Sequence, residues 1–333
     1  MNEQNPVLVN VWRGDMIESR HSGAFAVVDK TGNILESQGD IHRNIYARSS
    51  LKPVQALWLM ESGAADRFAL NAKQLAIACA SHGGEEQHTG LVNDWLATLG
   101  LSVESLECGV HRPSNGKARY NLTVSGQAAS ALHNNCSGKH TGFLCACVHS
   151  GIDPVGYINP DHPAQRAITR VIEETLEFKV SDQIPSIDGC GIPLYGIPLE
   201  RLANGLAGFS KPGGGNSLSQ QYRNRIVKSM MAEPFYVAGT DRFCTRTIEK
   251  SEETVVVKTG AEGVYIGIMR DAGIGIALKI DDGATRAAEV LMADLLSRYT
   301  RNNSFLEYLK NETQIKINNV AGNHVGNIMP AKR

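Results

Sequence analysis

Residues 47–55, ARSSLKPVQ, place a serine and a lysine three positions apart, just before an apolar run begins. A serine hydroxyl is a poor nucleophile until a base takes its proton, and a lysine can be that base only if its pKa falls well below about 10.4. At this spacing Ser49 and Lys52 share one face of a helix, so their side chains can meet. A helix start and burial would both favour a neutral Lys52. The alternative is a simple helix cap, with Ser49 or Ser50 capping, Pro53 in the first turn and a surface lysine.

A second serine and lysine pair is available in Ser81, on the turn ASHGGE, and Lys258, in VVVKTG. A KTG strand downstream of a Ser-x-x-Lys helix start is the order found in penicillin-recognising serine enzymes. The triplet alone carries little weight, because residues 30–32 are also KTG and have the composition of a turn. We therefore expect the two pairs to meet in one pocket only if the fold brings distant segments together.

Two further segments, HNNCSGKHTG (133–142) and DGCG (188–191), each place a cysteine in a tight, glycine-bearing turn beside polar groups. Two isolated cysteines and two candidate histidines make no standard zinc pattern. The spacing leaves open whether these thiols bind a metal or are structural. Cys145 and Cys147, inside an apolar run, are expected to be small buried hydrophobes.

The elements that must position these residues follow from periodicity. Residues 6–40 predict two or three strands with a hairpin turn at 30–33, and residues 72–101 predict helix at both ends of a break at 81–84. A helix is expected near His140, and another begins at Pro163. ETVVVKTG, GVYIGIMR and GIGIALKI predict an antiparallel meander, followed by a helix over 284–299. The glycine-rich PGGGNSLS (212–219) predicts a surface loop and lacks the GK[ST] ending of a phosphate-binding loop.

The composition predicts an ordinary globular α+β protein. The chain has 333 residues, 42% hydrophobic and 20% charged, with a net charge of -1. This charge favours a small-molecule partner over nucleic acid, and no apolar run suggests a membrane span. Seven cysteines without a tight framework, and no signal-peptide pattern at the start, predict a reduced, cytoplasmic protein. We expect one catalytic domain over residues 1–333, since no linker or repeat is apparent.

With these pieces together, the chain resembles the Rhizobium etli-type, or class 3, L-asparaginases, also called the asparaginase II family. The resemblance covers about residues 9 to 280, with no departure at the motif positions. It is carried by RSSLKPVQ, ASHGGE, CGVHRP, LHNNCSGKH, NPDHPAQ, DGCGIP, VAGTDRFCT and KTGAEGVY. It implies a serine-β-lactamase-like fold, with helices packed on an antiparallel sheet and a helical region, a homodimer, and hydrolysis of L-asparagine to L-aspartate and ammonia.

The resemblance also implies roles for individual residues. Ser49 matches the nucleophile and Lys52 its paired lysine, while Ser81 and Lys258 match a second pair. Three more match zinc ligands: Cys136, Lys139 and Cys190. Another three match neighbours of the substrate and of a metal-bound water: Arg48, His140 and Asp188. We expect the zinc to assist substrate binding more than the chemical step.

Two other functions are compatible with the same residues. One is a different Ser-x-x-Lys acyl hydrolase, such as an esterase or a β-lactamase-like enzyme. The other is a non-catalytic module that binds an amino acid, which the presence of both serine and lysine pairs disfavours.

Overall fold

The computed structural model describes residues 4–211 and 217–332. It combines a mainly antiparallel sheet with many helices, so the predicted α+β class is confirmed. The first five residues of the predicted loop PGGGNSLS lie outside the described residues.

The chain divides into two compact units. Unit 1 contains Met1–Ser50, Ile197–Pro212 and Lys250–Arg333, and unit 2 contains Leu51–Gly196 and Gly213–Glu249. The chain passes from one unit to the other four times, so neither unit is one continuous stretch of sequence. The single catalytic domain expected over residues 1–333 stays a prediction.

Unit 1 is built on a sheet in the order β11-β12-β1-β2-β10-β9-β8, with β3 beside β2. The strands are β1 Val7–Arg13, β2 Met16–Asp29, β3 Ile34–Gln38, β8 Val255–Thr259, β9 Val264–Met269, β10 Ile274–Ile280, β11 Ile315–Asn318 and β12 His324–Pro330. The predicted meander is thus confirmed as β8, β9 and β10, with neighbouring strands antiparallel. The predicted turn at 30–33 joins β2 to β3, and the Asp29 carboxylate accepts the Thr31 amide at 2.7 Å.

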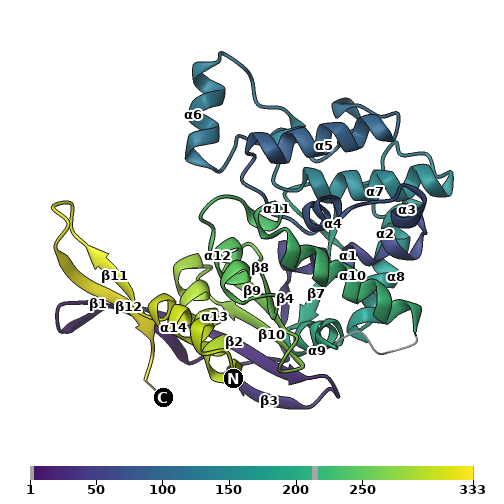
Figure 1. The fold of residues 1–333 in the computed structure, drawn as a ribbon. Helices are drawn as coiled ribbons and strands as arrows, with labels where there is room; N and C mark the ends of the chain where they lie inside the picture. Colours follow the sequence, from purple (N-terminus) through teal and green to yellow (C-terminus); the bar gives the residue numbers. More distant parts are fainter. Residues whose placement is uncertain (1–3, 212–216, 333) are drawn as a thin grey trace. The chain divides into compact units, whose positions relative to one another are not determined.

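Two helices, α9 (Leu199–Ser210) and α13 (Thr285–Tyr299), cover opposite faces of this sheet. A side chain at Gly275 would collide with the α9 backbone, whereas one at Gly267 would meet Met292 of α13. Gly267 pairs with Ile276, the residue after Gly275, and successive strand residues point to opposite faces. The predicted helix over 284–299 is therefore confirmed, and α14 (Asn303–Glu312) packs beside it (Figure 1).

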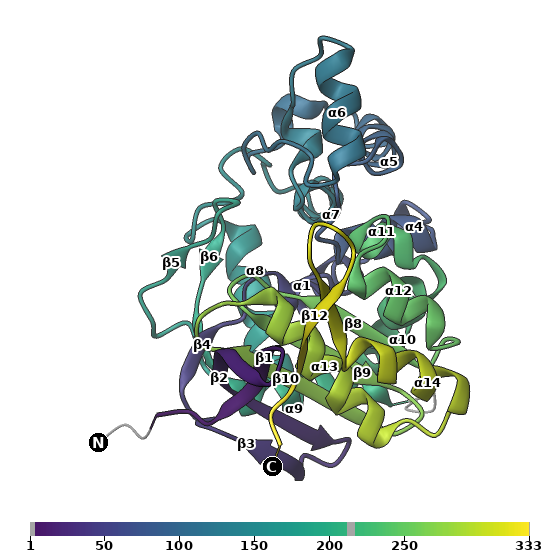
Figure 2. The same ribbon diagram turned by 90° about the vertical axis from the view of Figure 1, so that its left-hand side faces the viewer.

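Unit 2 is mostly helical. Its helices are α1 Lys52–Gln55, α2 Leu57–Glu61, α3 Ala64–Arg67, α4 Ala72–Ala78, α5 Glu86–Thr98, α6 Gly116–Val124, α7 Ser137–Ser150, α8 Pro163–Leu176, α10 Leu218–Ala232, α11 Pro234–Ala238 and α12 Phe243–Lys250, the last residue of which falls in unit 1. Short strands β5 (Ser186–Ile187) and β6 (Pro193–Leu194) form a hairpin in this unit. The other two-stranded sheet, β4 (Asn44–Tyr46) with β7 (Gly196–Pro198), belongs to unit 1 except for Gly196. Within unit 2, α4, α5 and α7 pack against one another (Figures 1 and 2).

The predicted helices of unit 2 are confirmed, with one error of detail at residue 49. The break at 81–84 separates α4 from α5, and Pro163 is the first residue of α8. The predicted cap by Ser49 or Ser50 is wrong. A 3-10 turn, Arg48–Leu51, precedes α1, whose N-cap is Leu51, and the Ser50 hydroxyl donates to Ala47 O at 2.6 Å. The hydroxyl thus closes the turn before the helix, since serine side chains readily bond to nearby backbone groups.

Candidate active site

Lys52 and Ser81 meet in the interior of unit 2. Lys52 is 1% exposed, and its Nζ donates to Ser81 Oγ at 3.1 Å, to Asn135 O at 3.5 Å and, over a short contact, to Ala80 O. All three contacts are to oxygens, which the ammonium form of lysine satisfies as a donor. A buried lysine beside a serine hydroxyl is an arrangement that can exchange a proton.

The segment that carries Ser81 is fixed by its neighbours on both sides. The Ser81 amide donates to Val237 O at 3.0 Å, and His82 links to helix α7 through Ser137 Oγ at 3.0 Å. The Gly84 amide donates to His82 Nδ1 at 3.2 Å, so the proton of this imidazole is on Nε2. Burial, with positive neighbours, holds the pKa of His82 well below its usual range, which keeps the ring neutral.

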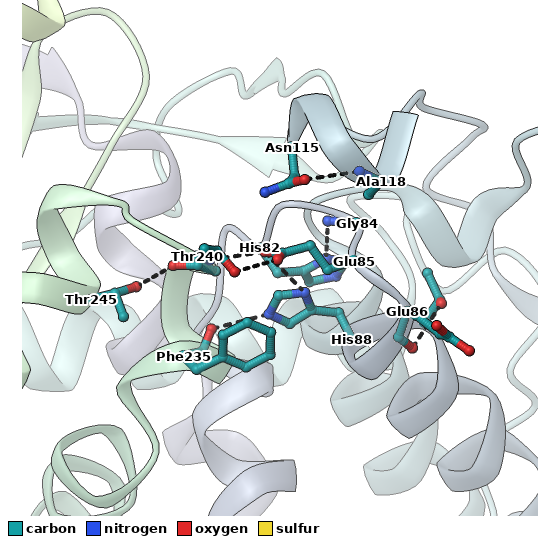
Figure 3. Close-up of polar contacts among 12 residues, drawn as sticks. His82, Gly84, Glu85, Glu86, His88, Asn115, Ala118, Phe235, Thr240 and Thr245 are labelled. Carbon is teal, nitrogen blue, oxygen red and sulfur yellow. Dashed lines mark hydrogen bonds and ion pairs between the residues drawn. The ribbon is translucent and has the colours of Figure 1, made fainter. Parts of the chain in front are cut away.

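Glu85 joins this segment to the residues that follow α11 (Figure 3). Its carboxylate accepts the Thr240 amide at 2.9 Å and the Thr240 hydroxyl at 2.5 Å. Gly239 has φ +106°, and a Cβ there would lie 2.4 Å from Glu85 Oε1, so only glycine fits. His88 stacks between His82 and Phe235 and hydrogen-bonds to Phe235 O at 3.0 Å. The sequence motifs ASHGGE and VAGTDRFCT are therefore held together as one framework.

A second buried cluster gathers two thiols and a lysine at the N-terminal end of α7. Lys139 Nζ donates to Cys190 Sγ at 3.0 Å, and the Cys136 and Cys190 thiols hydrogen-bond to each other. This bond holds the pKa of Cys136 well below its usual range, although burial opposes it, and the nearby ammonium groups of Lys52 and Lys139 help. The same bond and burial raise the pKa of Cys190. The shared bond therefore moves the two pKa values apart, down at Cys136 and up at Cys190.

The two sulfurs of this cluster change the pKa of Lys139. Burial lowers the pKa of Lys139, but the Cys190 and Cys136 sulfurs outweigh burial, and the pKa is raised overall. Lys52 Nζ also reaches the carbonyl of Asn135, the residue before Cys136, and its charge lowers the pKa of Cys136, so it lies between the Ser81 hydroxyl and the thiol pair. The serine and lysine contact and the thiol cluster thus form one continuous polar site in unit 2.

The two other residues expected near the substrate flank this cluster. His140, the next residue after Lys139, is fully buried, and its Nδ1 lies 2.6 Å from the Tyr157 hydroxyl. Asp188 is half-buried, with Oδ2 3.9 Å from Cys190 Sγ. Burial, followed by the charges of Lys139 and Lys52, holds the pKa of His140 well below its usual range.

Three of the predicted site residues belong to unit 1. Ser49 and Arg48 are half-buried on the 3-10 turn, and Arg48 has φ +52°, which is uncommon for a residue with a side chain. Lys258 is fully buried on β8, and its Nζ donates to Thr259 O at 2.7 Å. The convergence of these residues with Lys52 and Ser81 stays a prediction.

A family model described as L-asparaginase II matches residues 9–330 of the chain. The chain belongs to the L-asparaginase II family. The resemblance seen in the sequence motifs is confirmed, and family membership makes the protein an amidohydrolase. No curated protein matches the chain closely enough to count as a relative.

Solved structures also match this L-asparaginase II family member. One is a beta-lactamase from Mycobacterium bovis, with 15% identity and a TM-score of 0.41, covering 84% of this chain and 95% of that chain. Another is a simvastatin synthase mutant from Aspergillus terreus, with 8% identity and a TM-score of 0.34, covering 87% of this chain and 93% of that chain. At these TM-scores the likeness locates no site, and the α+β class stands on the strands and helices described above.

The remaining cysteines of this L-asparaginase II family member behave as the sequence predicts. Cys145 and Cys147 are buried in α7, and burial raises the pKa of each to about 12, which keeps them as inert thiols. All seven cysteines are free. Within residues 4–211 and 217–332, no helix is both long and apolar enough to cross a membrane.

Sequence reasoning missed several contacts of the site. It did not pair Ser81 with Lys52, whose Nζ lies 3.1 Å from Ser81 Oγ; the pairing of Ser81 with Lys258 stays a prediction. It also gave no role to Tyr157 or to Asn134, whose Oδ1 accepts the Cys136 amide at 2.9 Å. The tandem asparagines before Cys136 were the available signal, because asparagine side chains commonly fix tight turns.

Proposed function

We propose that this protein hydrolyses L-asparagine to L-aspartate and ammonia. The observation that supports this proposal most directly is the buried Lys52 and Ser81 contact at 3.1 Å, continuous with the Cys136, Lys139 and Cys190 cluster, in a member of the L-asparaginase II family. Such a site combines a proton-transfer pair with groups that can orient a polar amide.

In this proposal Ser49 is the nucleophile. Its Oγ forms a bond to the side-chain carbonyl carbon of asparagine. In the same step the hydroxyl proton passes to one of the two paired lysines, Lys52 or Lys258, in its neutral form. The oxyanion of the tetrahedral intermediate needs hydrogen-bond donors. The Ser50 amide already donates to Ala47 O at 3.2 Å, so the proposed donor from this turn is the Ser49 amide.

The leaving group needs a proton as the carbon–nitrogen bond breaks. The Ser81 hydroxyl and Lys52, which are in contact, can relay this proton, and ammonia departs. Water then attacks the aspartyl ester on Ser49, the carbon–oxygen bond to the serine breaks, and the proton returns to Ser49. Lys258 would complete the second serine and lysine pair.

The donor set at the N-terminal end of α7 fits a zinc ion. Two buried thiols and a lysine amine already contact one another, and sulfur and nitrogen are ligands that zinc prefers. Among the described residues, no three histidine, cysteine, aspartate or glutamate side chains form a metal-binding group, so the site would need Lys139 as its third protein ligand. Lys139 would have to lose its proton to bind.

Cys136, Lys139 and Cys190 would hold this ion, and its charge would be largely offset by the thiolates. When bound, zinc supplies a Lewis acid that orients the polar groups of the substrate. Arg48 and Asp188 would bind the charged groups of the amino acid. A homodimer acting in the cytoplasm completes the proposal, and light scattering of the purified protein tests the dimer.

An assay of substrate range tests the function. Purified protein should release ammonia from L-asparagine and show little turnover of nitrocefin or p-nitrophenyl esters. Ester or nitrocefin turnover without ammonia release would favour another acyl hydrolase. Binding of asparagine without any turnover, unchanged in Ser49→Ala, would favour a non-catalytic binding module.

A further inference from the structure

The hydroxyl of Tyr157 is placed between two groups in the interior of unit 2. Tyr157 is fully buried. Its oxygen accepts the Glu107 amide at 3.0 Å and lies 2.6 Å from His140 Nδ1. The backbone of Tyr157 is held in place as well, because the side-chain amide of Gln165 donates to the Tyr157 carbonyl oxygen at 2.8 Å.

Counting hydrogens at this hydroxyl assigns the tautomer of His140. The Glu107 amide is a donor only, so it occupies a lone pair of the tyrosine oxygen. The hydroxyl hydrogen then needs an acceptor, and among the described residues His140 Nδ1 is the only one within hydrogen-bond distance. A proton on Nδ1 would leave this buried hydroxyl hydrogen without a partner, which is unfavourable for a buried polar group. The proton of the neutral imidazole is therefore on Nε2.

The Nε2 atom of His140 is itself buried and has no hydrogen-bond partner among the described residues. Buried polar groups are nearly always paired, so an orphaned donor of this kind calls for an explanation. The adjacent residue is Lys139, part of the thiol cluster described above. A donor kept buried and unpaired at this position is suited to an oxygen that arrives with a ligand.

We infer that Tyr157 is a positioning residue that locks His140 as the Nε2–H tautomer, so that His140 donates a hydrogen bond to an oxygen of the bound substrate. This inference rests on the proposed function for the identity of that substrate. It assigns His140 to binding and excludes it as the general base, because a base would need a lone pair on Nε2. Glu107 contributes through its backbone amide, and its carboxylate accepts the Gly156 amide at 2.7 Å, which fixes the chain beside Tyr157.

Nitrogen-15 NMR of the histidines in the full-length protein tests the tautomer directly. The His140 signal is identified by its disappearance in His140→Gln. We expect the wild-type spectrum to show His140 protonated at Nε2, and Tyr157→Phe to shift this signal toward a mixture of tautomers. Tyr195→Phe is the matched control, because it removes another buried hydroxyl, 3.2 Å from Thr169 Oγ1, and should leave the signal unchanged. Wild-type His140 protonated at Nδ1 would overturn the inference.

Kinetics test the role of the donor. A glutamine amide can place N–H groups near the position of Nε2, whereas the shorter asparagine cannot. We expect KM for L-asparagine to stay within about threefold of wild type in His140→Gln and to rise about tenfold in His140→Asn. In Tyr157→Phe KM should rise by the factor that the remaining Nε2–H fraction in the NMR spectrum sets, about twofold for an equal mixture. The change in kcat should be under about threefold in all three variants. Equal KM values in His140→Gln and His140→Asn, or a large loss of kcat in both variants, would overturn the inference.

The two experiments separate this inference from the proposed function. Binding of L-aspartate, the proposed product, should move the Nε2 signal even in a protein that turns over slowly. If neither the wild-type protein nor any variant releases ammonia from asparagine, the proposed function fails, while the NMR result still decides the tautomer. If ammonia is released but aspartate leaves the His140 signal unchanged, the inference fails and the function stands.

Discussion

The two candidate hydroxyls of this protein, on Ser81 and Ser49, have very different surroundings. Ser81 is 6% exposed, its segment is tied to α7 and to the residues after α11, and Lys52 contacts its Oγ. Ser49 is half-buried on a 3-10 turn whose first residue, Arg48, has positive φ. A rigid, shielded hydroxyl suits proton transfer, whereas a more exposed hydroxyl on a strained turn suits attack on an incoming substrate.

The largest expected effect is the loss of the nucleophile. Ser49→Ala should lower kcat for ammonia release by at least about 10³-fold, because no covalent intermediate can form. The matched control is Ser50→Ala, which removes the neighbouring hydroxyl and its bond to Ala47 O. Ser50→Ala should keep kcat within about threefold and lose about 1 kcal/mol of stability in urea denaturation. Comparable activity in both variants would remove Ser49 from the mechanism.

Ser81→Ala should have a smaller effect, because it removes the relay and leaves the nucleophile. We expect kcat to fall by about 10²-fold. An asparagine-like electrophile should still add mass to Ser49 in this variant, as located by peptide mass spectrometry. If the adduct in the wild-type protein is found on Ser81, then Ser81 is the nucleophile and Ser49 is not.

Most of the fold could be predicted from the sequence, since the strands and helices have regular apolar patterns. The three β-branched runs gave β8, β9 and β10, and Pro163 gave the start of α8. The exception was the segment around Ser49, where the Ser50 hydroxyl donates to Ala47 O and does not cap the helix. Propensity could not decide this, because a serine hydroxyl can either donate to a nearby carbonyl or accept from a helix amide.

The site could be predicted only in part. The residue types and motifs pointed to side chains that lie together in unit 2, but not to their partners. Lys52 meets Ser81 because its side chain reaches the segment that follows α4, 28 and 29 positions further along the chain, and no spacing in the sequence encodes that contact. The tautomer of His140 depends on Tyr157, 17 positions further along the chain. Such contacts are tertiary, so they lie beyond what periodicity can show.

The rigidity of the Ser81 segment can be tested at Gly239. Gly239→Ala would force an unfavourable φ and bring a Cβ to 2.4 Å from Glu85 Oε1. We expect a loss of about 2–3 kcal/mol in urea denaturation and a fall in kcat of about tenfold, as Ser81 shifts. Gly100→Ala is the control, because it also has positive φ, of +71°, but no atom within 4 Å of the added Cβ. The control should lose about 1 kcal/mol and no activity. Equal effects in the two variants would show that Glu85 does not hold this framework.

The smallest expected effect concerns the thiol cluster, which shares Lys52 with Ser81. If the cluster holds zinc for orienting substrate, removal of the metal should raise KM for L-asparagine about tenfold and change kcat by less than about threefold. Metal analysis must confirm that the chelated sample is metal-free, and added zinc should restore KM. Cys190→Ser should reproduce the chelated KM and no longer respond to zinc, because it removes one proposed ligand while keeping a small polar group. A metal-free sample that kept its KM and lost most of its kcat would instead place the ion in the chemical step. The buried surroundings of Ser81 would then contribute a metal ion to catalysis, besides the proton relay.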